Sequence, residues 1–316
     1  MSKMRLLQQA QGQTFEGFVL IKSAAVRQNV KGADYLDLVL TDNEGEAVAK
    51  MWDYSPTTHG TFDADDIVKV RGSIVLWKDS EQLKIERIRH TIATDEVDMS
   101  LLVPCAPYDP QDLFCELHSL AEGFADDDLR RLVLYLMDKN KDKLLLFPAA
   151  VKLHHATRGG LIHHTWSIVQ LCTKIIELYP SLNSDLLYSG AILHDIGKIK
   201  EMDTGALGLA SAYTEDGQLI GHINIGVSMV DSAAEVLGIS KHTAMLVEHM
   251  ILSHHGQPEF GSPKLPMFPE AEVLSVCDML DSKLYEMFSA LDGILKGGFS
   301  ERQWALDNRQ LYRHDL

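Results

Sequence analysis

The chain has 316 residues, and its 46% hydrophobic and 23% charged residues fit a folded protein of two domains rather than a disordered one. Its formal net charge is −16, which argues against coating of nucleic acid by a uniformly basic surface. No stretch resembles a signal peptide or a membrane span, and the four cysteines are scattered without a C-x-x-C pair. We therefore expect a cytoplasmic protein without disulfides, a structural zinc site or membrane contact.

Residues 1–93 carry the alternation and the β-branched residues of a β-rich domain. The segment from Asp42 to Gly45 has the composition of a tight turn between two strands. Five strands in such a span predict a small closed barrel of the OB type. The expected strands are 15–21, 35–40, 47–52, 67–77 and 82–88.

Residues 94–110 are predicted to be a linker, because an acidic stretch is followed by Pro104, Pro107 and Pro110. After it, apolar residues recur at helical spacing, and this pattern continues to about Leu295. The predicted architecture is therefore a barrel over residues 1–93, followed by an all-α helical bundle over residues 111–316.

Histidines and aspartates form an ordered series within the helical domain. Imidazole and carboxylate ligands without thiolates suit Mn²⁺, Fe²⁺, Zn²⁺ and other borderline divalent ions. A helical bundle can bring such side chains from several helices onto one interior surface. In chain order the series is His154, His155, His163, His164, His194, Asp195, His222, His249, His254, His255, Asp278 and Asp281.

The most specific signal is the segment Leu193-His-Asp-Ile-Gly-Lys198. His194 offers a neutral nitrogen ligand, and the two oxygens of Asp195 can bridge two metal ions. Lys198 follows Asp195 by three residues, which places it on the same helix face, where it can meet a phosphate oxygen.

This segment resembles the signature of the HD superfamily of metal-dependent phosphohydrolases. Other motifs are similar to those of the YhaM-type 3′→5′ exoribonucleases, and the resemblance covers nearly the whole chain. It implies an N-terminal OB-fold, a C-terminal HD domain, a divalent metal cofactor and single-stranded RNA as substrate. The motifs are Pro148-Ala-Ala150, His154-His155, Gly159-Gly-Leu161, His164-Thr165, Gly221-His222, Leu252-Ser-His-His-Gly256, Gly261-Ser-Pro263 and Glu270-Ala271.

The resemblance also implies a role for each candidate residue. Mn²⁺ is the expected ion, with Fe²⁺, Zn²⁺, Mg²⁺, Co²⁺ and Ni²⁺ as alternatives, and one or two ions are expected per chain. Asp195 and Lys198 are the expected catalytic residues. The first ion is expected on His164, His194, Asp195 and Asp278, and the second on His222, His254 and His255, with Asp195 bridging.

Some of these assignments have a structural alternative. His163 precedes His164, and the resemblance favours His164 as the ligand, because HD proteins place Thr or Ser after the ligand and Thr165 follows His164. His155 either lines the substrate cleft, as a binding residue, or packs near the glycines that follow it. Asp281 shares a helix face with Asp278 and can orient a ligand without binding metal itself.

In the barrel, Trp52 is the first candidate for a base-stacking platform, because Lys50 lies two residues earlier on the same strand face. Packing in the barrel core is the alternative for an aromatic residue. Despite the negative net charge, basic residues place a local positive face on the strands. They are Lys50, Lys69, Arg71, Lys84, Arg87 and Arg89.

The predicted function is metal-dependent 3′→5′ hydrolysis of single-stranded RNA, with DNA as a further possible substrate. A phosphohydrolase of small nucleotides or cyclic dinucleotides is the first alternative, since HD sites act on many phosphate esters. A nucleic-acid-binding regulator with a vestigial HD site is the second, and the intact ligand set argues against it. The OB-type barrel favours a polymeric substrate over a small one.

Overall fold

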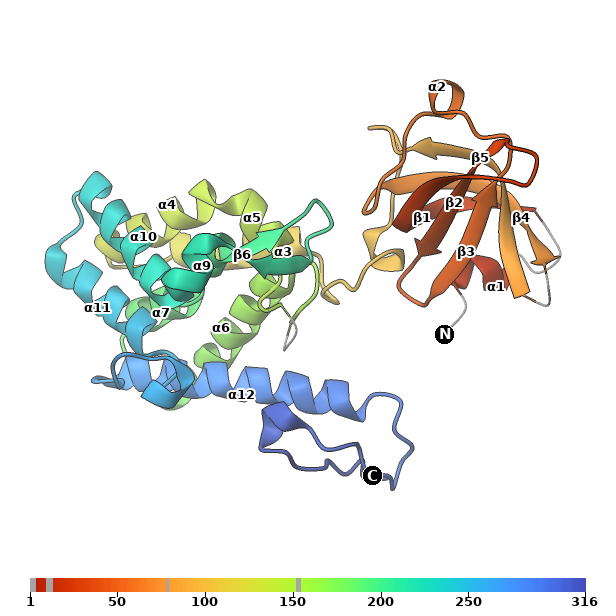
Figure 1. The fold of residues 1–316 in the computed structure, drawn as a ribbon. Helices are drawn as coiled ribbons and strands as arrows, with labels where there is room; N and C mark the ends of the chain where they lie inside the picture. Colours follow the sequence, from red (N-terminus) through yellow and green to blue (C-terminus); the bar gives the residue numbers. More distant parts are fainter. Residues whose placement is uncertain (1–3, 10–13, 78–79, 152–154) are drawn as a thin grey trace. The chain divides into compact units, whose positions relative to one another are not determined.

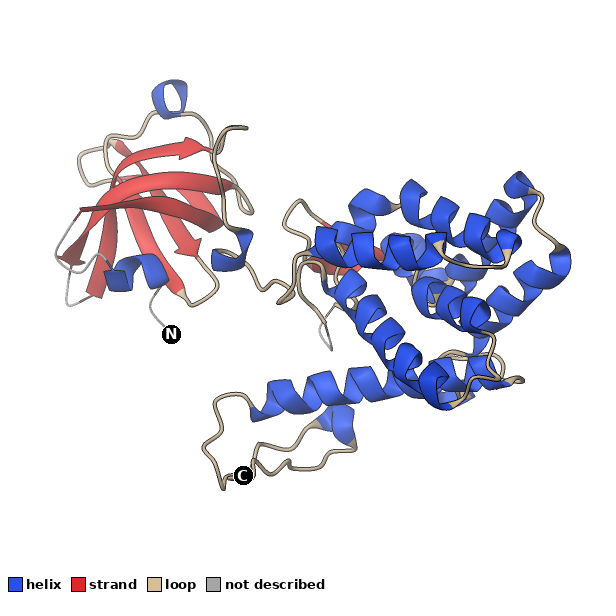
Figure 2. Cartoon of the chain, turned by 180° about the vertical axis from the view of Figure 1, so that it is seen from behind, coloured by secondary structure: helices blue, strands red, loops and turns tan. Residues whose placement is uncertain are grey.

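The computed structural model describes residues 4–9, 14–77, 80–151 and 155–316. The chain divides into two compact units, Met1–Cys105 and Ala106–Leu316. The first unit is a β-barrel, and the second consists mainly of helices (Figures 1 and 2). Each unit has its own apolar core, and the two cores share no residue.

Five strands close the barrel in the order β1-β2-β3-β5-β4, and β1 pairs with both β2 and β4. Most of the barrel core comes from alternate residues of these strands, and on β2 Leu36, Leu38 and Leu40 point inward. The short helix α2, Pro56–His59, follows β3. The predicted OB-type barrel is confirmed. The strands are β1 Thr14–Gln28, β2 Asp34–Thr41, β3 Glu46–Met51, β4 Ile67–Trp77 and β5 Ser80–His90.

The predicted linker, residues 94–110, is not a free connection over most of its length. Asp95 accepts two hydrogen bonds from the Arg89 guanidinium, at 2.7 and 2.8 Å. Leu102 and Val103 are buried, so this part of the chain packs as a component of the barrel unit. Closely spaced prolines end helices and strands, but they do not prevent the segment between them from packing.

The second unit packs its helices around one apolar core. Asp109, Asp126 and Asn183 each cap a helix by accepting a hydrogen bond from a first-turn amide. None of the described helices is both long and apolar enough to cross a membrane. The helices are α3 Pro110–Glu122, α4 Asp127–Lys139, α5 Lys141–Leu146, α6 Gly160–Leu178, α7 Ser184–Leu193, α8 Lys198–Glu201, α9 Glu215–Leu219, α10 Gly221–Leu237, α11 Lys241–Ser253 and α12 Pro269–Leu291.

This unit also contains a small sheet, which the prediction of an all-α domain did not include. Strand β6, Met202–Thr204, pairs antiparallel with β7, Ala210–Tyr213. The hairpin directly follows α8. Strands of three and four residues are too short to give a recognisable alternation in the sequence.

After α12 the chain folds back on itself, and we call residues 292–316 the C-terminal hairpin (Figure 1). Its two arms are joined by the hydrogen bond from Gly297 N to Arg313 O, at 2.7 Å. The Arg313 guanidinium also donates to the carbonyls of Leu291 and Ile294, at 3.3 and 2.6 Å. These bonds hold the hairpin against the end of α12.

Candidate metal centre

All seven predicted metal ligands lie in one region of the helical unit, and each is buried or half-buried. The elements that carry them are far apart in the sequence and meet because their apolar faces share one core. His164 lies on α6, His194 and Asp195 at the end of α7, His222 in the first turn of α10, His254 and His255 at the end of α11, and Asp278 on α12.

One ligand group surrounds the Oδ2 atom of Asp195. This oxygen lies 3.2 Å from His194 Nε2 and 3.6 Å from His164 Nε2. Asp278 joins the group through its Oδ1 atom, which lies 3.2 Å from His164 Nε2. The four predicted ligands of the first ion are therefore brought together.

A second group faces the other oxygen of the same carboxylate. Asp195 Oδ1 lies 3.6 Å from His222 Nε2 and 3.7 Å from His254 Nε2. The His255 ring completes this group, with its centroid 4.1 Å from that of His254 and 5.3 Å from that of His222. Each oxygen of the Asp195 carboxylate thus faces one histidine group, so Asp195 would be a ligand of both cations if two ions bound.

Carboxylates orient one histidine of each group. His164 Nδ1 lies 2.7 Å from Asp281 Oδ2, and His222 Nδ1 lies 2.9 Å from Glu201 Oε1. When Nδ1 carries the ring proton and donates a hydrogen bond to the carboxylate, Nε2 carries the lone pair that a metal ion needs. Asp281 was predicted as such a supporting residue. Glu201 was not, since nothing in the sequence connects it with His222.

Backbone carbonyls orient two other histidines. His194 Nδ1 lies 2.9 Å from Ala191 O, and His254 Nδ1 lies 2.7 Å from Ile251 O. Both rings sit at the C-terminal end of a helix, where the last carbonyls lack a partner within the helix and can accept a side-chain proton. The helix ends therefore hold these rings with Nε2 toward Asp195.

The unpaired atoms at the centre fit a divalent cation. Among the buried polar atoms without a hydrogen-bond partner in the described part of the chain, four lie at this centre: His194 Nε2, His222 Nε2, His254 Nε2 and Asp195 Oδ1. Each such atom costs about 1–3 kcal/mol when it is left unsatisfied. Three unpaired imidazole nitrogens around one carboxylate, together with an unpaired oxygen of that carboxylate, are explained if the site binds metal. Nitrogen and oxygen donors suit borderline divalent ions.

The charge states of the ligands agree with metal binding. Burial lowers the pKa of His254 well below its usual value, so this ring is neutral. Burial raises the pKa of Asp195, but Lys198 and His194 outweigh it and hold this carboxyl ionised. Burial lowers the pKa of His164 too, but the bonds to Asp278 and Asp281 raise it to about 9, so a cation must displace a proton there.

Lys198 lies on the same side of the chain as Asp195, as its spacing predicted, and it also pairs with this carboxylate. Its Nζ lies 2.7 Å from Asp195 Oδ2, and the residue is almost completely buried. Lys198 also lines a cavity that adjoins the predicted metal ligands and is described below. One ammonium group therefore both holds the central carboxylate and borders the space available to a substrate.

His155 does not line this cavity, in contrast to its predicted role as a substrate-binding residue. It is buried, and its Nε2 lies 3.0 Å from Asp281 Oδ2, so it supports that carboxylate from behind His164. The ring of His163 packs against it, with centroids 4.7 Å apart. His154 lies outside the described residues.

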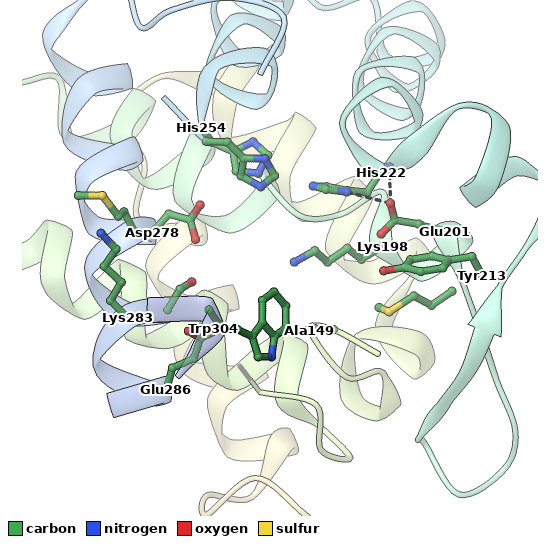
Figure 3. Close-up of a pocket in the computed structure, with 16 residues that line it drawn as sticks. Ala149, Lys198, Glu201, Tyr213, His222, His254, Asp278, Lys283, Glu286 and Trp304 are labelled. Atoms are coloured by element: carbon green, nitrogen blue, oxygen red, sulfur yellow. Dashed lines mark hydrogen bonds and ion pairs between the residues drawn. The ribbon is translucent and has the colours of Figure 1, made fainter. Parts of the chain in front are cut away.

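A cavity of about 500 Å³ adjoins the ligands (Figure 3). Part of its wall consists of Lys198, Glu201 and the ligands His222, His254, His255 and Asp278. Other parts come from residues that are not predicted ligands. These include Tyr213 of β7, Lys283 and Glu286 of α12, and Trp304 of the C-terminal hairpin.

In the barrel unit, two aromatic rings and one cation form a cluster. The Tyr35 and Trp52 ring centroids lie 4.8 Å apart, and Lys50 Nζ lies 5.1 and 6.0 Å from them. Trp52 directly follows β3 and is 41% exposed, so part of its surface is available to a ligand.

Four of the predicted basic residues lie together on the barrel. They border a groove of about 410 Å³ that also contains Glu16 and Glu86. These acidic residues pair with two of the basic ones, at 2.9 and 3.6 Å, so the groove is only partly positive. The basic residues of the groove are Lys69, Arg71, Arg87 and Arg89.

The cluster of histidines and aspartates in the helical unit defines an HD-domain protein. The barrel that precedes this unit is of the OB type, which commonly binds nucleic acid. The family described as HD domain matches residues 161–283, which include all seven predicted ligands.

Two relatives are similar along nearly the whole chain. Both are 3′-5′ exoribonuclease YhaM, one from Shouchella clausii (strain KSM-K16) and one from Geobacillus sp. (strain WCH70). Each is 39% identical over 302 residues, which is 96% of this chain and 94% or 92% of the relative. The chain belongs to the YhaM family. The solved HD domain of the phosphodiesterase PgpH from L. monocytogenes is 20% identical and covers 47% of this chain and 73% of its own, with a TM-score of 0.29.

Proposed function

We propose that this chain is a metal-dependent 3′→5′ exoribonuclease that hydrolyses the phosphodiester bonds of single-stranded RNA. Two family members at 39% identity carry this activity in their names. The observation in the structure that best supports it is the Asp195 carboxylate, which directs one oxygen toward each of two histidine groups. Such an arrangement suits phosphodiester hydrolysis assisted by two metal ions.

The residues around the cluster have complementary tasks in this proposal. Bound divalent cations, with Mn²⁺ as the proposed ion, supply Lewis-acid polarisation of the phosphoryl group and acidify a water molecule. Asp281 and Glu201 hold the Nδ1 protons of their histidines, so that Nε2 faces the centre. Lys198 holds Asp195 in place and offers positive charge to a phosphate in the cavity.

The barrel is the proposed binding unit for the rest of the strand. Trp52 and Tyr35 offer ring faces on which bases can stack, and Lys50 lies over both rings. RNA rather than DNA is the proposed substrate. The cytoplasm is the proposed compartment, because Cys115, Cys172 and Cys277 are free thiols, as a reducing environment keeps them.

The direct test is incubation of the Mn²⁺-loaded protein with 5′-end-labelled single-stranded RNA, the same sequence as DNA, and a panel of nucleotides and cyclic dinucleotides. The expected result is stepwise shortening of RNA with the 5′ label retained, and loss of activity on chelation. Hydrolysis of the small nucleotides alone would favour the small-nucleotide alternative. Binding of RNA without hydrolysis of any substrate would favour the alternative of a nucleic-acid-binding regulator with a vestigial HD site.

A further inference from the structure

The cavity beside the ligands has an aromatic residue that the metal centre does not use. Trp304 lies in the short helix η3, Trp304–Leu306, of the C-terminal hairpin, and together with Ala305 it lines the cavity. Figure 3 shows its indole on the opposite side of the Lys198 side chain from His254. The Trp304 residue is 75% exposed, so most of its surface is available for contact.

The hairpin holds Trp304 in a defined position. Leu306, at the other end of η3, is buried, and its backbone nitrogen donates to Gln303 O at 3.0 Å. Gln303 N in turn donates to Arg309 O, also at 3.0 Å, which closes the loop around η3. Because the backbone of this loop is already fixed, binding needs to order only the side-chain torsions of Trp304 and not the loop that carries it.

The rest of this side of the cavity has groups that suit a nucleotide. Tyr213 contributes a second ring from the β6–β7 hairpin. Lys283 of α12 contributes an ammonium group, and no ion pair engages it in the described part of the chain. An aromatic face can stack on any base, and an ammonium group can contact a phosphate.

We infer that Trp304 is a binding residue for the terminal nucleotide, whose base stacks on the indole while its phosphate reaches the metal centre. The inference rests on the proposed exoribonuclease function and assigns the subsite for the 3′ end. A cavity of about 500 Å³ has the size of a small-molecule site. It therefore takes the end of a strand rather than a long stretch of it, and stacking makes this recognition independent of sequence.

The test compares Trp304→Ala, Trp304→Phe and the unaltered protein on two RNAs, one with an ordinary 3′-terminal nucleotide and one whose 3′-terminal nucleotide lacks its base. For the ordinary RNA, Trp304→Ala is expected to raise KM about ten-fold, and Trp304→Phe much less, because one stacking contact is lost or kept. For the RNA without the terminal base, all three proteins are expected to have the same, raised KM.

Phe288→Ala is the matched control, since Phe288 is 70% exposed on α12 but does not line the cavity. This variant is expected to behave like the unaltered protein. The inference is overturned if Trp304→Ala leaves KM unchanged, raises it equally for both RNAs, or changes the oligomeric mass in solution, which would assign Trp304 to a contact between copies. If the unaltered protein does not shorten RNA at all, the proposed function fails and the inference with it.

Discussion

At the scale of single residues, Asp195 connects the charged groups of the centre. Lys198 and two histidine groups all contact this one carboxylate. Asp195→Asn keeps the shape of the side chain but removes its charge, and it leaves Lys198 buried without a counter-ion. We expect the turnover of single-stranded RNA to fall about a thousand-fold, because a bridging ligand supports several kcal/mol of transition-state stabilisation.

Turnover and the bound Mn²⁺ content, by elemental analysis, measure the effect of Asp195→Asn. Asp203→Asn is its control, since it makes the same chemical change at an exposed position on β6. Turnover of Asp195→Asn near that of this control would place the catalytic centre elsewhere.

The two orienting carboxylates allow the two ligand groups to be tested separately. Asp281→Asn replaces the charged acceptor of His164 by a neutral amide, and Glu201→Gln does the same to the acceptor of His222. Each change is expected to weaken Mn²⁺ binding about 10- to 100-fold, the usual effect of losing such a partner. In a calorimetric titration with Mn²⁺, the two variants should weaken different binding steps. A single step, weakened equally by both changes, would show that only one ion binds.

At the scale of elements, the glycine of the His-Asp-Ile-Gly-Lys segment sets the distance between two parts of the centre. A Cβ atom at Gly197 would lie 2.0 Å from His222 O and 2.8 Å from Gly226 N. Gly197→Ala must therefore push α10, and His222 with it, away from Asp195. We expect the free energy of unfolding to fall by about 1–3 kcal/mol, as in other overpacked sites.

Chemical denaturation and Mn²⁺ titration measure this effect of Gly197→Ala. Gly205→Ala is the matched control, because a Cβ at Gly205 would meet nothing within 4 Å. If Gly197→Ala binds Mn²⁺ as well as this control does, the close approach of α10 is not what positions His222.

At the scale of the whole molecule, the separate cores of the two units predict separable activities. A chain of residues 106–316 is expected to fold and to hydrolyse a short oligonucleotide, while its affinity for long single-stranded RNA falls at least ten-fold. Loss of stacking on two bases alone accounts for this decrease, at about 1–3 kcal/mol per base. Trp52→Ala in the full chain is expected to have a smaller effect of the same kind.

Equilibrium binding at one salt concentration compares these proteins without interference from ionic strength. Val48→Ala is the control for Trp52→Ala, since Val48 is a similarly exposed apolar residue of β3. Equal affinity of the full chain, the shortened chain and Trp52→Ala would show that the barrel does not hold the strand.

The sequence by itself determined the order of the two folds and the identity of the candidate ligands. Alternation along the strands and helical spacing after residue 110 are local signals, because each depends only on which face of one element is buried. The His-Asp-Ile-Gly-Lys segment is local as well, since Lys198 lies three and four residues after Asp195 and His194, on the same helix face. The resemblance to HD proteins then identified the distant ligands.

Only the tertiary structure decided which groups meet. The pairing of Glu201 with His222 and the position of Trp304 beside the ligands depend on packing between distant segments. The burial of Leu102 and Val103, within the segment predicted to be a linker, is likewise a property of the packed first unit and not of the local sequence. Lys198 was expected on the same helix face as Asp195, where it could meet a phosphate, and the structure shows that it also pairs with the Asp195 carboxylate. Spacing along a chain specifies the face of an element, whereas contacts between elements depend on how all of their buried faces fit into one core.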